Sequence, residues 1–412
     1  MGERCANSNW GHKMMTEKRK EIRKAILLAV MCMFSYLGCY IARNVLSVVS
    51  PQMIKTGLFT VENIGLLSTG YMICYGVGQF INGVIGDLVK AKYMISAGLI
   101  LAGICNVCIT SMNHITLIII VYSLTGFFLS MIYAPLMKIV AENTHPVYAS
   151  RCSLAFSVAF YLGTPIASLL AVLFQWKMAF VACGVILIVM GIVCFSVYTI
   201  FEIKGVIKNQ KEEKIKALHF DVPTLLKLGI VQITAVSILT GVVRTSVVFW
   251  VPTYLSNYLN LSKGLTASVF TVINLVVSIA APISMILLYD FLLKRSMKGM
   301  FLTMFGLGVV SFLMMFITRN PIINTIFLAL ALFSAEGGST MVFCVYCPSI
   351  GKTGMVSTVT GFLDSASYLG AAIANVLFAN IVVKIGWQNL ILVWMFFMII
   401  GVGISFIKGR EE

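Results

Sequence analysis

The stretch YIARNVLSVVSP, Tyr40–Pro51, places an arginine inside a run of apolar residues that is long enough to cross a lipid bilayer. Of the 412 residues, 59% are hydrophobic and 11% are charged, and the mean hydropathy is +0.96. Ordinary soluble domains carry roughly 25% charged residues. This composition predicts an integral membrane protein with little chain left for a soluble catalytic domain.

Further apolar stretches resemble the one around Arg43. A helix needs about 20 apolar residues to cross the hydrocarbon core. The sequence predicts twelve such helices, over residues 25–49, 62–86, 93–112, 115–137, 152–174, 178–201, 228–255, 265–289, 299–318, 321–347, 354–383 and 387–407. The fold class expected is therefore all-α, and the lipid bilayer is the first partner.

The basic residues behind the net charge of +15 are distributed unevenly between the two sets of loops. If the N-terminus is cytoplasmic, most Lys and Arg fall on cytoplasmic segments, as the positive-inside rule requires. The external loops hold only Lys55, Lys177, Lys263, Arg319 and Lys384. We therefore explain the positive charge by membrane topology and expect no nucleic-acid partner. We expect a multi-pass protein of the cytoplasmic membrane with both termini in the cytoplasm.

The chain also repeats itself. Pro51 follows Arg43 by eight residues, and Pro252 follows Arg244 by the same interval. Asp87 in the first half and Asp290 in the second close the next helix. The segments YLGTPIA and YLGAAIA then follow at matching places, and each is followed by a tryptophan. Repeats of this kind are typical of transporter folds.

The repeat predicts two pseudo-symmetric six-helix bundles. We expect a cytoplasmic tail at 1–24, an N-terminal bundle at 25–201, a cytoplasmic linker at 202–222, a C-terminal bundle at 223–407 and a tail at 408–412. The first 24 residues are basic, but the apolar run after them is too long for a signal peptide.

Arg43 and Arg244 occupy equivalent places on the first helix of each half, so we expect them to face each other across the pseudo-two-fold axis. An arginine inside the hydrocarbon costs at least about 2.5 kcal/mol and usually faces a bundle interior or a cavity. One alternative is a side chain that snorkels or is internally paired. The other is an anion site, because a guanidinium binds phosphate or carboxylate in a bidentate geometry.

Polar stripes accompany the arginines at helical spacing. They comprise Tyr36, Tyr40, Arg43 and Ser47 on 25–49, Tyr71, Tyr75, Gln79 and Asn82 on 62–86, and Thr360, Asp364, Tyr368 and Asn375 on 354–383. Such stripes line a cavity or form hydrogen bonds that hold helices together. Both interpretations remain open from the sequence.

Two acids, Glu336 and Asp364, fall midway along expected helices. They could be neutral through burial, pair permanently with Arg244, or bind and release protons during transport. Elsewhere, GVIGDLVKAK joins two helices, and we expect Gly83 and Asp87 in it to form a cytoplasmic gate. Lys138, near a cytoplasmic helix end, is interpreted as a snorkelling side chain.

The histidines lie in tails and loops, and the cysteines show no metal-ligand spacing, so we expect no metal and no cofactor. No nucleophile, metal cluster or nucleotide loop points to an enzyme.

These residues resemble the major facilitator superfamily, and within it the organophosphate:phosphate antiporters, which include the glycerol-3-phosphate and hexose-phosphate transporters. The superfamily resemblance covers about residues 25–407, and the narrower one rests on four motifs. These are YIARNVLSVVSP, YGVGQFINGVIGD (75–87), VVRTSVVFWVPTYL (242–255) and STVTGFLDSASYLGAAIAN (357–375). The resemblance implies that Arg43 and Arg244 hold a phosphate moiety and that Tyr36, Tyr40, Tyr75 and Tyr368 line the site.

This chain departs from the glycerol-3-phosphate members at three positions of the site. Gln79 and Phe160 stand where those members have a lysine and a histidine, and Asn44 replaces a basic residue. The site has lost cations and gained Glu336, which makes small phosphate esters a less direct match.

The expected function is a monomeric secondary transporter that moves an organic anion, a phosphorylated metabolite, in exchange for inorganic phosphate. The alternatives are a proton-coupled symporter that uses Glu336 or Asp364, and a membrane sensor of a phosphorylated metabolite.

Overall fold

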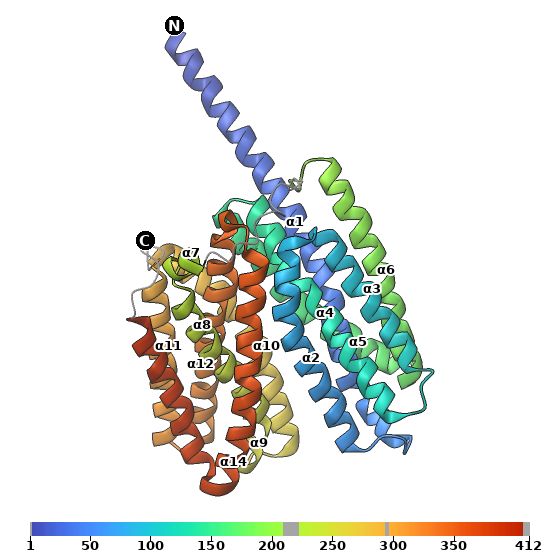
Figure 1. Ribbon diagram of the computed structural model, residues 1–412. Helices are drawn as coiled ribbons and strands as arrows, with labels where there is room; N and C mark the ends of the chain where they lie inside the picture. The colour runs from blue at the N-terminus through green and yellow to red at the C-terminus, as the bar shows by residue number, and fades with distance from the viewer. Residues whose placement is uncertain (1, 209–221, 293–295, 407–412) are drawn as a thin grey trace. The chain divides into compact units, whose positions relative to one another are not determined.

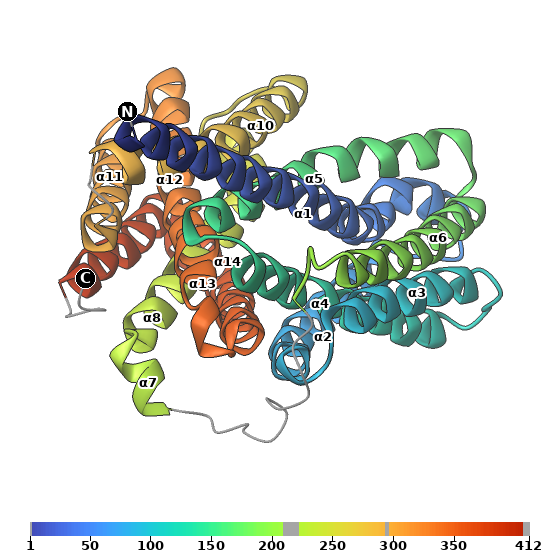
Figure 2. The same ribbon diagram turned by 90° about the horizontal axis from the view of Figure 1, so that it is seen from above.

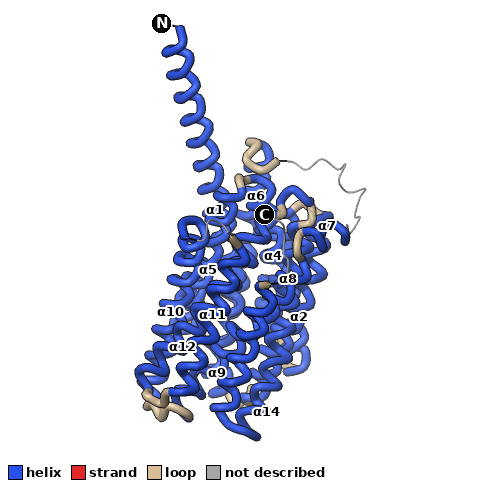
Figure 3. The backbone as a smooth tube through the Cα atoms, turned by 90° about the vertical axis from the view of Figure 1, so that its left-hand side faces the viewer, coloured by secondary structure: helices blue, strands red, loops and turns tan. Residues whose placement is uncertain are grey.

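A computed structural model describes residues 2–208, 222–292 and 296–406. Within this part of the chain every regular element is a helix, and Figure 3 shows no strand there. The expected linker 202–222 lies mostly outside the described residues, and the expected tail 408–412 lies entirely outside them.

The chain divides into two compact units. The first comprises Met1–Lys214 and Cys347–Val359, and the second comprises Ile215–Tyr346 and Thr360–Glu412. The segment Cys347–Val359, which leads into the last long helix, thus belongs with the first unit.

Six long helices build the first unit. They are α1 (Gly2–Lys55), α2 (Val61–Leu88), α3 (Ala91–Ile109), α4 (Ile115–Asn143), α5 (Pro146–Leu173) and α6 (Trp176–Ile203). Helix α2 packs along α4, α1 packs along α5, and α3 packs against both α4 and α6 (Figures 1 and 2). Most of these contacts join helices that are not consecutive in the sequence.

The contact between α3 and α6 is made by backbone. A Cβ on Gly103 would lie 2.6 Å from the carbonyl oxygen of Gly184, and a Cβ on Gly184 would lie 2.6 Å from that of Gly103. Lipid tails are as apolar as leucine, so helices in a membrane associate largely through close packing of small residues. These two glycines allow α3 and α6 to approach closely.

The second unit is more irregular. It contains α7 (Val222–Lys227), α8 (Ile230–Gly241), η2 (Val242–Val247), α9 (Val248–Asn257), α10 (Lys263–Leu287), η3 (Leu288–Leu292), α11 (Met297–Ile317), α12 (Pro321–Thr340), η4 (Met341–Tyr346) and most of α14 (Val356–Ser405). The short α13 (Cys347–Ser349) and η5 (Gly351–Thr353) connect α12 to α14 as part of the first unit.

Three of these elements, η2, η3 and η4, are π-helical turns. The helix axis bends by 45° between the segments Ile230–Thr245 and Trp250–Asn257, around η2. Inserted π turns and prolines are common causes of such bends, and Pro252 follows shortly after. π turns are frequent at functional sites.

Helix α14 is two helices in sequence. Gly386 has φ = 83°, which breaks the helical backbone within α14. This break matches the expected division between 354–383 and 387–407. Glycine adopts a positive φ at little cost.

Nine described helices are long and apolar enough to cross a membrane, or ten if the bent pair around η2 is one span. They coincide with the expected stretches except 152–174 and 354–383, which fall on α5 and the first part of α14. The all-helical, multi-pass architecture is thereby confirmed, and the count of twelve spans stays a prediction.

The glycine contact generates a test. Gly103→Ala should lower the Tm of the detergent-solubilised protein, because the added methyl group forces α3 from α6, and overpacking costs about 1–3 kcal/mol. Gly306→Ala, in the middle of α11 with no atom within 4 Å of the new Cβ, is the matched control. It should be neutral or stabilising, since alanine favours a helix by about 0.5–1 kcal/mol over glycine. Equal Tm values for the two variants would contradict the backbone contact.

Candidate functional site

Arg43 lies within the membrane span of α1, beside α2. Its guanidinium carbon is 5.9 Å from the centroid of the Tyr75 ring, and its Nη2 donates to the Met72 sulfur at 3.8 Å. A guanidinium over an aromatic face is attracted by the quadrupole of the ring, by up to about 2 kcal/mol when water is excluded. Arg43 is therefore held inside the first unit against an aromatic wall.

Aromatic residues of α1, α4 and α5 form a second cluster in this unit. The ring of Tyr36 packs against Tyr40 at 5.0 Å, Tyr133 at 5.3 Å and Phe156 at 6.0 Å. Tyr36 and Tyr75 are buried, and Tyr40 is half-buried. Tyr36 and Tyr40 of α1 therefore lie in one aromatic cluster, and Tyr75 of α2 belongs to the same unit.

The polar stripe of α2 resolves into two kinds of residue. Asn82 donates to the Ser130 hydroxyl at 2.7 Å and to the Phe127 carbonyl at 3.3 Å, so it ties α2 to α4. Gln79 is fully buried, and neither its amide nitrogen nor its amide oxygen has a hydrogen-bond partner among the described residues. A buried polar group without a partner costs about 1–3 kcal/mol. Asn82 therefore holds helices together, whereas Gln79 has unused hydrogen-bonding capacity.

In the second unit, Arg244 lies in η2 and pairs with Glu336 of α12. The Nη1–Oε2 distance is 3.6 Å, and the side chains are 29% and 22% exposed. The pair neutralises both charges, yet part of its surface stays accessible. The sequence left three possibilities for Glu336: a neutral buried acid, an ion pair with Arg244, or proton exchange. The structure shows the ion pair with Arg244.

Two more of the predicted site residues lie on α14 in this unit. Asp364 is buried, and Tyr368, one turn later, is half-buried. In the preceding turn, the fully buried Thr360 hydroxyl has no hydrogen-bond partner among the described residues. The side chain of Asn375 lies outside the description.

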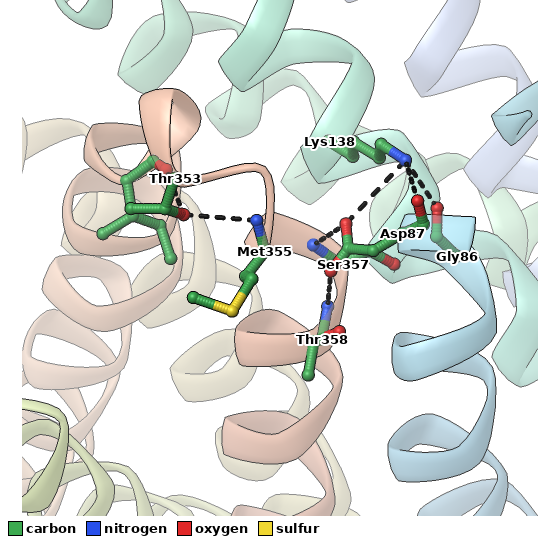
Figure 4. Close-up of polar contacts among 8 residues, drawn as sticks. Gly86, Asp87, Lys138, Thr353, Met355, Ser357 and Thr358 are labelled. Atoms are coloured by element: carbon green, nitrogen blue, oxygen red, sulfur yellow. Dashed lines mark hydrogen bonds and ion pairs between the residues drawn. The ribbon is translucent and has the colours of Figure 1, made fainter. Parts of the chain in front are cut away.

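The expected gate residue Asp87 binds the first turn of α14 (Figure 4). Its Oδ1 accepts from the backbone N–H of Ser357 at 3.1 Å, and its Oδ2 accepts from that of Thr358 at 2.7 Å. A carboxylate at a helix N-terminus satisfies unpaired N–H groups and interacts favourably with the helix dipole. Nearby, a Cβ on Gly86 would overlap the Ser357 hydroxyl, so a larger residue there would require Ser357 to shift.

Lys138 corrects the sequence interpretation. The side chain does not snorkel: it is only 7% exposed, and its Nζ donates to the carbonyl oxygens of Gly86 at 2.8 Å and Asp87 at 3.1 Å. It also lies 3.8 Å from the Asp87 carboxylate. Asp87 and Lys138 are 51 residues apart in the sequence, so no local sequence pattern predicts their contact. Gly83, the other expected gate residue, is buried in α2.

Comparison with known proteins gives the family. The model of the Major Facilitator Superfamily matches residues 32–375. The glycerol-3-phosphate transporter of Bacillus subtilis is 24% identical over 262 residues, which are 58% of this chain and 58% of the relative. The membrane sensor protein UhpC of Salmonella typhimurium is 29% identical over 106 residues, 26% of this chain and 24% of the relative. The chain thus matches between about a quarter and three fifths of the length of these curated relatives.

Solved structures agree in fold. A bacterial homologue of the iron transporter ferroportin, in its outward-facing state, has a TM-score of 0.73 at 12% identity, over 92% of this chain and 98% of that chain. The proton:xylose symporter XylE has a TM-score of 0.71 at 11% identity, over 94% and 97%. Members of this superfamily are membrane transporters and not enzymes. The family match over most of the sequence, together with the shared helical fold, shows that this chain belongs to the Major Facilitator Superfamily.

Proposed function

We propose that this protein is a secondary transporter that carries an organic anion, a phosphorylated metabolite, across the cytoplasmic membrane in exchange for inorganic phosphate. The observation that carries the proposal is Arg43, a cation within a membrane span, held 5.9 Å from the Tyr75 ring. An intramembrane arginine is costly and marks a substrate or ion pathway by default. Similarity to a glycerol-3-phosphate transporter supports a phosphorylated substrate.

The internal repeat supports a role for both arginines. Arg43 and Arg244 occupy equivalent places in the sequence repeat, so we assign both guanidinium groups a part in anion binding. Anion binding offsets the desolvation cost of the arginine side chains, and this favours closure of the carrier once the substrate is bound. An empty carrier closes poorly, which makes obligatory exchange a consequence of electrostatics.

Proton-coupled symport is the second candidate, and the Arg244–Glu336 pair favours it. An anion that binds Arg244 competes with the Glu336 carboxylate at 3.6 Å. Protonation of Glu336 removes this competition and would couple anion binding to proton uptake. Asp364, buried on α14, is the other acid available to this mechanism.

The cytoplasmic gate is proposed to be the cluster of Asp87, Lys138 and the first turn of α14, with Gly83 earlier on α2. Its hydrogen bonds join α2 and α4 to the N-terminus of α14. A transporter that opens to the cytoplasm must break such contacts in each cycle.

The phosphate-exchange proposal predicts that liposomes preloaded with phosphate and containing the wild-type protein take up labelled phosphate. Arg43→Lys and Arg244→Lys should each slow this exchange by about tenfold or more, because lysine cannot reproduce the bidentate contact. Arg319→Lys, on the exposed loop between α11 and α12, should exchange as the wild type does. Phosphate binding without any exchange would instead favour a sensor.

A pH gradient across vesicles without internal phosphate separates antiport from symport. Obligatory exchange predicts no uptake of the labelled anion under the gradient alone, because the empty carrier does not return. Gradient-driven uptake by the wild type, abolished by Glu336→Gln, would establish the symporter and overturn obligatory exchange.

The gate predicts a specific loss of stability. Asp87→Asn should lower the Tm of the solubilised protein through loss of about 1–2 kcal/mol, since it removes the charge that faces the helix N-terminus and Lys138. Glu202→Gln is the matched control, because Glu202 forms an ion pair with Lys92 at 2.6 Å and, among the described residues, accepts from no helix N-terminus. A larger loss in Glu202→Gln than in Asp87→Asn would argue against the gate cluster.

A further inference from the structure

Basic residues are concentrated on helix α1 just before its apolar part. Helix α1 continues without a break from Gly2 to Lys55, and five of the seven residues 18–24 are lysine or arginine. Clusters of about four to eight such residues beside a membrane span are typical of segments that bind anionic lipids. The positive-inside rule accounts for the number of these cations, but not for their distribution around the helix.

Two of the arginines continue a stripe of exposed apolar side chains. Residues at i, i+4, i+7 and i+11 share one face of a helix, and this series joins Arg19, Arg23, Ile26 and Val30. Both arginines are exposed, Ile26 is 56% exposed and Val30 is 55% exposed, and the neighbouring Leu27 is 50% exposed. Lipid tails are as apolar as leucine, so large apolar side chains exposed on a membrane span contact lipid. The arginines therefore lie directly beyond the lipid-facing side of α1.

An acidic residue of the same segment lies on the other side of the helix. The same spacing joins Glu21 to Ala25, Leu28 and Cys32, all three of which are buried. The Cys152 thiol of α5 donates to the Ala25 carbonyl at 3.3 Å, so this face of α1 packs against the protein. The charges are thus segregated, with the two arginines in line with the lipid-facing residues and Glu21 in line with the buried ones.

The positions along the helix match the depth of lipid headgroups. An α-helix rises about 1.5 Å per residue, so the backbone of Arg23 lies about 4.5 Å beyond Ile26, and that of Arg19 about 10 Å beyond it. The headgroup region of one leaflet is about 5–8 Å thick. A lipid whose acyl chains cover Ile26 therefore has its phosphate within reach of these long side chains, and a guanidinium binds phosphate in a bidentate geometry.

We propose that Arg19 and Arg23, together with Ile26, Leu27 and Val30, form a binding surface for an anionic phospholipid. The three apolar residues contact the acyl chains, and the two guanidinium groups bind the headgroup phosphate. The surface lies on the exposed face of α1, so the inference is independent of the proposed anion transport.

The choice of lipid provides the test. Native mass spectrometry on the full-length, detergent-solubilised protein compares the affinity for phosphatidylglycerol, which is anionic, with that for phosphatidylcholine, which is zwitterionic and can carry the same acyl chains. The wild type should bind phosphatidylglycerol about tenfold or more tightly, because each cation near a lipid headgroup contributes about fivefold. Arg19→Gln/Arg23→Gln should lose most of this preference, whereas Arg19→Lys/Arg23→Lys, which keeps both charges, should retain most of it.

Lys18→Gln/Lys204→Gln is the matched control, because it removes the same charge from two other exposed positions. Lys18 lies seven residues before the buried Ala25 and hence on another face of α1, and Lys204 ends α6. This variant should keep the preference of the wild type.

Three outcomes would overturn the lipid surface. The first is a wild-type protein that binds both lipids equally, which would assign the arginines to an acidic protein partner instead. The second is an unchanged preference in Arg19→Gln/Arg23→Gln. The third is an equal loss in the control variant, which would show that net charge alone is responsible. The wild-type comparison needs no variant to fold, and none of these outcomes bears on the proposed anion transport.

Discussion

A charged side chain inside the hydrocarbon is costly unless the protein compensates it, because water is absent there. The charged side chains of the membrane spans are arranged by this constraint. Arg43 packs over an aromatic ring, Arg244 pairs with Glu336, and Lys138 is surrounded by oxygen atoms of α2. Each arrangement lowers the cost of a charge that a bilayer would otherwise exclude.

Within this frame the two units differ in the chemistry they present. The first unit offers a cation, tyrosine rings and an amide with unused hydrogen bonds. The second offers an arginine whose charge is already compensated, set in a π-helical turn. The sequence repeat made the two arginines equivalent, yet the structure gives them different neighbours. The acid beside Arg244 supplies the candidate for proton coupling.

The proposed gate would link the same constraint to movement. Asp87 replaces water at the N-terminus of α14, and Lys138 compensates its charge. The same interactions that make this cluster stable outside water make it a discrete contact, either formed or broken. A helix terminus held by a side chain of another helix is suited to such two-state behaviour.

The sequence by itself determined the helical class and the membrane location, because hydropathy accumulates along a single span and needs no tertiary information. It also indicated the family through short motifs, and it singled out both arginines, the tyrosines and Asp87 as candidates, since a charge or a polar stripe in an apolar helix is visible locally. Only the tertiary structure decided which of these residues have partners. Asn82 and Gln79 are indistinguishable in a helical stripe, and Lys138 resembles a snorkelling lysine, until the rotation and packing of α2 against α4 set their neighbours. Partner choice depends on contacts between residues far apart in the chain, and no local pattern encodes them.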